Sequence, residues 1–176
     1  MVTNSDKPLA SSAEVYILFN GYASERVAST VAFVRDGGIR VIIDPGMVPS
    51  PSAILEPLAA LGESPAAITD VIFSHHHPDH TLNAALFPNA RFHDHWAIYK
   101  NDIWDSRPAE GFDVSPSIRL IETPGHTPQD ITTLVGTPDD VIAFTPWNLS
   151  GNRQEGGRME ESRTRVQRSR GGRRET

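Results

Sequence analysis

The chain has 176 residues, a formal net charge of −6 at pH 7 and no cysteine. This length suits one domain with a buried core, and the lack of cysteine excludes disulfides and thiolate ligands or nucleophiles. The charge is uneven, because residues 1–147 carry 8 basic and 18 acidic side chains, whereas residues 148–176 carry eight arginines and four glutamates. The excess of acidic side chains in residues 1–147 disfavours binding to nucleic acid, so a nucleic-acid partner is not expected.

Strand and helix patterns alternate along the chain after a polar start at residues 1–12, which we expect to be flexible. Segments rich in Val, Ile and Phe and bounded by Gly or Pro predict strands, and they cover residues 14–22, 29–38, 39–46, 67–74, 90–99, 117–125, 130–137 and 140–145. The turn Asp36-Gly37-Gly38 fits a β-hairpin. Helical spacing of apolar residues predicts a helix over 50–63 and a shorter one over 80–88.

The alternation of strand groups and helices indicates an α/β fold, in the form of an α+β sandwich. Residues 13–147 hold nearly all the apolar side chains and form the predicted domain. Residues 148–176 are rich in Arg and Gly and too poor in apolar residues to form a core, so we expect a disordered tail. The N-terminus lacks the features of a signal peptide, and no segment has the length of a membrane span. We therefore expect a cytoplasmic protein with no membrane partner.

Four of the seven histidines lie in the stretch HHHPDH at residues 75–80, directly after a predicted strand. In an extended segment, residues two apart point to the same side, so His75 and His77 can reach one metal ion. Pro78 keeps His77 out of a helical conformation and so protects this arrangement. Asp79 and His80 then point elsewhere, towards a second metal position. Imidazole and carboxylate ligands suit Zn²⁺, and also Fe or Mn.

Two alternatives to a metal site exist for this stretch. An affinity tag would be a plain histidine run at a terminus, which excludes that reading. A polar surface loop remains an alternative, although the specific spacing disfavours it. For His93 and His95 we prefer a surface or pocket-wall role to ligation, because no third ligand is near in sequence. Aromatic residues at 96, 99 and 104 could belong to the core or line a substrate pocket.

Three motifs in order resemble the metallo-β-lactamase-fold metallohydrolases: VIIDPG at 41–46, HHHPDH at 75–80 and TPGHTPQD at 123–130. The resemblance covers roughly residues 14–146 and implies the family's αββα fold. It implies that His75, His77 and His126 bind a first zinc ion.

For the second zinc ion, the resemblance implies Asp79 and His80 as ligands. Asp79 would also be the catalytic residue that orients the attacking water or accepts its proton. Asp44 would support the metal loop through hydrogen bonds. The implied function is zinc-dependent hydrolysis of a small ester, thioester or lactone by a metal-activated water molecule.

The resemblance breaks after Thr145. Complete relatives supply an aspartate between the two metals and a further histidine, whereas here no aspartate follows Asp140 and no histidine follows His126. We therefore expect an incomplete second half, truncated or read out of frame beyond residue 146, with one zinc ion where complete relatives hold two. A sheet face left exposed could be covered by a homo-oligomer. The alternatives are a metal-binding protein without catalysis and a nuclease-type member of the superfamily.

Overall fold

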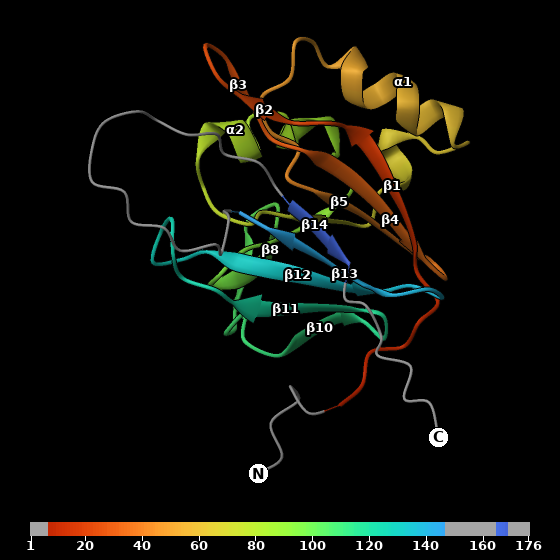
Figure 1. Ribbon diagram of the computed structural model, residues 1–176, viewed down its shortest axis with the longest axis vertical. Helices are drawn as coiled ribbons and strands as arrows, with labels where there is room; N and C mark the ends of the chain where they lie inside the picture. Colours follow the sequence, from red (N-terminus) through yellow and green to blue (C-terminus); the bar gives the residue numbers. More distant parts are fainter. Residues whose placement is uncertain (1–6, 147–164, 169–176) are drawn as a thin grey trace.

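The protein is described by a computed structural model, which covers residues 7–146 and 165–168. Its strands form a seven-stranded and a five-stranded sheet that face each other (Figure 1). The first sheet has the order β1-β4-β5-β6-β7-β8-β9 and the second the order β10-β11-β12-β13-β14, while β2 and β3 form a separate hairpin. Parallel pairing occurs where β6 lies between β5 and β7; the other pairs are antiparallel.

The strands of the first sheet and the hairpin have the following bounds: β1 (Glu14–Phe19), β2 (Tyr22–Ala23), β3 (Val27–Ala28), β4 (Val31–Asp36), β5 (Ile39–Ile43), β6 (Asp70–Ile72), β7 (Arg91–His93), β8 (Ala97–Lys100) and β9 (Ile103–Ser106). The second sheet contains β10 (Phe112–Ser115), β11 (Ile118–Glu122), β12 (Ile131–Gly136), β13 (Val141–Thr145) and β14 (Arg165–Arg168). The helices are α1 (Ser52–Ala60), α2 (Pro78–Thr81) and the 3₁₀ turns η2 (Pro65–Ala67) and η3 (Ala84–Leu86).

Two apolar cores explain how these elements are layered. One core lies between the sheets and combines residues such as Ile43 and Ile72 of the first with Leu120 and Phe144 of the second. The other lies between the first sheet and α1, on the side away from the second sheet (Figure 1). Leu58 of α1 is fully buried there, and such burial contributes about 1.5–3 kcal/mol for a leucine side chain.

The predicted sandwich is confirmed, with layers in the order helix, sheet, sheet. Within the described residues no helix packs on the outer face of the second sheet, so the outer helical layer of the αββα arrangement is not seen there. We expected the first sheet to expose an apolar face that a second copy could cover. That expectation is wrong for its inner face, because strands β10 to β13 precede residue 146 and bury it.

Several boundaries differ from the sequence prediction. The segment 90–99 forms two strands, because a tight turn at residues 94–96 separates β7 from β8. Strands β9 and β10 were not predicted, and the helix predicted over 80–88 is replaced by α2 and η3. The predicted hairpin between β4 and β5 is confirmed, with Asp36 paired with Ile39 across the turn. Gly37 there has φ +57, which favours glycine.

The ends of the chain differ in part from the expected flexible termini. Ala10 N–H donates to the Pro116 carbonyl and the Ser12 hydroxyl donates to Asp36, so these residues are held against the sandwich. Within the predicted tail, β14 pairs antiparallel with β13, which the sequence did not indicate. Residues 1–6, 147–164 and 169–176 lie outside the described residues. No helix in the described part is long and apolar enough to cross a membrane.

Candidate metal centre

The predicted site residues gather at one edge of the sandwich. The parallel strands β5, β6 and β7 all point their carboxyl ends to this edge, and the loop at 123–130 of the second sheet reaches it from the other side. Ile131 N–H donates to the Ser74 carbonyl at 2.9 Å, which ties the two sheets together beside the metal loop. Residues far apart in sequence are thus brought to one place.

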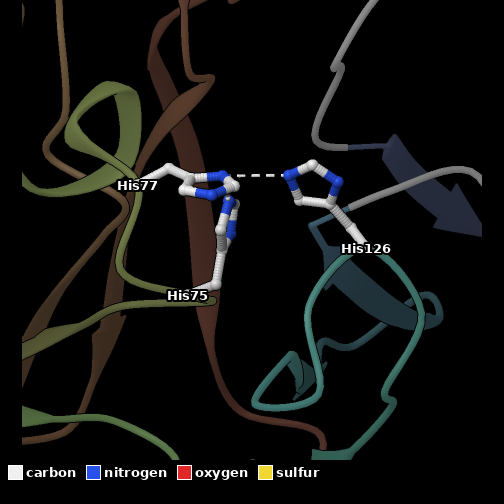
Figure 2. A group of neighbouring side chains, drawn as sticks. All are labelled: His75, His77 and His126. Carbon is white, nitrogen blue, oxygen red and sulfur yellow. Dashed lines mark hydrogen bonds between the residues drawn. The ribbon is translucent and has the colours of Figure 1, made fainter.

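Three histidines converge at this edge (Figure 2). One ring nitrogen of each histidine lies within 4.8 Å of those of the other two. His75 Nε2 and His77 Nδ1 are 3.0 Å apart, and His77 Nδ1 and His126 Nε2 are 2.9 Å apart. His77 has φ −67 and ψ 147 before Pro78, so the extended conformation predicted for it is confirmed.

The donor set of these histidines fits a metal ion. Zinc–imidazole bonds of 2.0–2.1 Å in a tetrahedron separate two nitrogens by about 3.3–3.4 Å, close to the observed spacing. His75 is buried, whereas His77 and His126 are exposed, so the group opens to solvent on one side. Three imidazole nitrogens with an open side are the ligand pattern of catalytic zinc sites. The three histidines could therefore hold one metal ion and leave a position for water or substrate.

Asp79 and His80 lie beside this cluster, as expected. The rings of His75 and His80 are 4.1 Å apart between centroids. His80 Nε2 lies 3.3 Å from Asp79 Oδ2 but without hydrogen-bonding geometry, so this buried nitrogen has no hydrogen-bond partner. The pair could bind a second ion. Thr145 and Pro146 stand at the end of β13, so up to residue 146 no further carboxylate joins the pair from that strand.

Asp44 supports the metal loop from below, as the sequence predicted. It is fully buried and has φ 51, which is unusual for a residue other than glycine. Its carboxylate accepts hydrogen bonds from Ser74 N–H at 2.7 Å and Ser74 Oγ at 2.8 Å. Its other contact is His80 Nδ1, at 2.9 Å. Asp44 therefore orients both the start of the loop and the His80 ring.

The metal-free electrostatics of the two positions differ. Burial, followed by repulsion from His80, lowers the pKa of His75 to about 4. Burial also disfavours the charged form of His80, but Asp44 and Asp79 more than offset this and raise the pKa of His80 to about 10. At neutral pH His75 is therefore neutral and ready to bind a metal, whereas His80 is a cation that must lose its proton first.

Two carboxylates at this edge were missed by sequence reasoning. Asp130 is buried and accepts from His126 N–H at 2.7 Å and Thr127 N–H at 3.0 Å, so it shapes the loop that carries His126. Asp94 follows β7 and lies 3.1 Å from His76 Nε2 through its Oδ2. Asp130 was within a quoted motif, but nothing in its spacing indicated this role.

The remaining histidines do not join the cluster. His93 is buried and its Nε2 lies 2.7 Å from Asp70 Oδ1, so the surface or pocket-wall role expected for it is wrong. The reason is a buried acidic partner supplied by β6. His95 is half-buried with an unpaired Nδ1. Trp96 and Trp104 are exposed rather than part of the core.

Comparison with known sequences identifies the family. The family model described as the metallo-beta-lactamase superfamily matches residues 25–117, more than half of the chain. An uncharacterized protein of Caenorhabditis elegans is 32% identical over 120 residues, which are 62% of this chain and 32% of that protein. Metallo-beta-lactamase domain-containing protein 1 of Xenopus laevis is 29% identical over 133 residues, 69% of this chain and 56% of that one. The chain thus spans about a third to just over half of these relatives' lengths.

Solved structures share the fold. A Thermotoga maritima protein assigned to the metallo-beta-lactamases has a TM-score of 0.64 and 26% identity, and the match covers 79% of this chain and 82% of that chain. A quorum-quenching N-acyl homoserine lactone lactonase has a TM-score of 0.55 and 16% identity, and the match covers 76% and 71% of the two chains. With the family model matched over more than half of the chain, the chain belongs to the metallo-beta-lactamase superfamily.

Proposed function

We propose that this protein binds zinc through His75, His77 and His126 and hydrolyses a small ester, thioester or lactone. The convergence of three imidazole nitrogens within 4.8 Å carries this proposal. Iron or manganese would fit the same nitrogen and oxygen donors, but tetrahedral imidazole sites favour zinc. When bound, zinc polarises a carbonyl group and lowers the pKa of water to about 7.

The protein's own residues supply the remaining chemistry. Asp79 accepts the proton of the attacking water, because its carboxylate is ionised at neutral pH: the close contact with the His80 ring, at 3.3 Å, outweighs burial and lowers the pKa of Asp79. His80 in turn is held by Asp44 at 2.9 Å. Asp130 holds the loop that carries His126 in place. The acidic body repels polyanions, which favours a small substrate over nucleic acid.

One observation favours a second candidate, a metal-binding protein with little catalysis. Asp79 and His80 are the two donors at the second position within the described residues, and without a metal ion Asp44 and Asp79 raise the pKa of His80 to about 10 against the effect of burial. Two ligands rarely retain an ion, so the charge that develops on a reacting carbonyl would be less well stabilised than with two ions. We therefore expect slow turnover with one zinc ion, in place of the two-zinc site of complete relatives.

The test compares zinc-loaded wild-type protein with two variants on a panel of one activated ester, one thioester and one lactone. His126→Ala should lose both zinc and activity, whereas Asp79→Asn should keep the first zinc and lose most of the rate. His95→Ala, which removes an imidazole outside the cluster, is the matched control and should retain both. Zinc binding without turnover of any panel member in the wild type would favour the metal-binding alternative. Activity that survives His126→Ala would contradict the proposal.

A further inference from the structure

The middle histidine of the metal loop points away from the cluster and makes its own contacts. His76 Nε2 lies 3.1 Å from Asp94 Oδ2. Its ring stacks on Trp96, with centroids 5.5 Å apart and an angle of 24°, and its other ring contact is Phe73 at 5.9 Å. Phe73 directly follows β6, Asp94 and Trp96 lie in the turn after β7, and none of the three belongs to the group of His75, His77 and His126.

Asp94 is a rigid partner for this histidine. It is 2% exposed, and its Oδ1 accepts hydrogen bonds from Trp96 N–H at 2.7 Å and Ala97 N–H at 2.8 Å. Its main-chain carbonyl accepts a further hydrogen bond from Arg107 at 2.9 Å. The backbone of the turn therefore fixes the carboxylate, and Oδ2 is left facing His76.

The main chain of the loop has little support of its own at this point. Within residues 7–146 no backbone hydrogen bond involves the peptide groups of His75 or His76, whereas the carbonyl of His77 accepts from His80 N–H at 2.9 Å. Side-chain contacts must therefore hold the direction of these residues. Because His76 is joined directly to His75 and His77, a contact that fixes the His76 side chain also restricts the directions of its two neighbours, of which His77 is extended with φ −67 and ψ 147.

We propose that Asp94 is a positioning residue of the metal centre, acting through His76 to keep His75 and His77 turned towards His126. This inference rests on the proposed metal site. Partners behind metal ligands of this kind typically change metal affinity about 10- to 100-fold when removed. Asp94 and Asp44 thus hold the loop through different residues, one through His76 and the other through Ser74 and His80.

The test uses two substitutions at the half-exposed position 76. His76→Phe retains a ring that can stack on Trp96 but removes the hydrogen bond, and the Kd for zinc should rise about 10- to 100-fold. His76→Gln places an amide NH₂ near the position of Nε2 and should recover most of the affinity. Zinc affinity is measured by competition with a chromophoric chelator. The visible spectrum of the cobalt(II) form reports the ligand geometry, and thermal unfolding of chelated protein reports stability.

A second variant keeps the test informative if the substitutions at position 76 impair folding. Asp94→Asn keeps an oxygen for the N–H groups of Trp96 and Ala97 but turns an NH₂ group towards His76, so zinc affinity should fall in the same direction. Unchanged affinity and an unchanged cobalt spectrum in His76→Phe would overturn the role of Asp94 while leaving the metal centre intact. Equal losses in the Phe and Gln variants would also overturn it, because the hydrogen bond would then not matter. A wild-type protein that binds neither metal would refute the metal site itself.

Discussion

Gly46 is the residue whose substitution should damage the metal loop most directly. A Cβ atom built on Gly46 would overlap the carbonyl group of Asp79 and the amide of His80. All of these are backbone atoms, so Gly46→Ala must push the start of α2 away by over an ångström. That movement would break the hydrogen bonds to the Asp79 carbonyl from Ser29 N–H at 3.2 Å and Met47 N–H at 3.1 Å.

The expected loss follows from these contacts. Two hydrogen bonds contribute about 0.5–1.5 kcal/mol each, and overpacking typically costs about 1–3 kcal/mol, so Gly46→Ala should destabilise the protein by about 2–6 kcal/mol. Urea unfolding measures this loss, and elemental analysis should show reduced zinc content, since His77 and His80 flank Asp79. Gly38→Ala is the control, because nothing lies within 4 Å of its Cβ position. Equal stability and zinc content in the two variants would refute the reasoning.

Three further predictions concern stability. Burial tends to raise the pKa of Asp36, but hydrogen bonds from three serines outweigh burial and lower it. The stability that ionised Asp36 contributes is therefore present above about pH 4 and lost as pH falls through the lowered pKa. Acid unfolding should be shallower in Asp36→Asn. In chelated protein, the stability contributed by charged His80 is lost as pH rises from 6.5 to about 10. The stability contributed by neutral His75 is lost as pH falls from 6.5 to about 4. Melting temperatures should therefore peak between these limits, and His80→Gln should remove the alkaline decline. Leu58→Ala should lower the free energy of urea unfolding by about 2–5 kcal/mol and leave zinc affinity unchanged. The control Glu56→Ala should not change stability. A loss of stability in both variants would indicate that the effect does not come from the core.

The parts of the site that could be predicted are those whose residues lie close together in the sequence. His75, His77, Asp79 and His80 lie within six residues after an apolar strand, so their chemistry and alternation are visible without a fold. Asp44 and His126 were identified because their motifs resemble a known family. The structure confirms the hydrogen bonds of Asp44 to the loop and the approach of His126 to His77.

The parts that were missed depend on pairing between distant segments. Asp94 reaches His76 because β7 lies parallel to β6, a register that local patterns do not encode. The same pairing buries His93 against Asp70, although the lack of a third ligand nearby in sequence had favoured a surface or pocket-wall role. Strands β9 and β10 were missed because their mostly exposed or half-buried residues give a weak apolar pattern. Pairing with β13 likewise gives β14 its strand conformation within a polar, Arg-rich stretch.

The central claim is that His75, His77 and His126 form one metal site in this chain. Calorimetric titration of zinc into chelated protein tests it most directly, because it gives both stoichiometry and affinity. We expect about one tight zinc ion per chain, since three imidazoles complete the first position whereas the second offers two donors, Asp79 and His80, and the pKa of His80 is raised to about 10. The tight phase should disappear in His126→Ala and persist in His95→Ala. No tight binding in the wild type, two tight ions per chain, or a tight phase that survives His126→Ala would contradict this account.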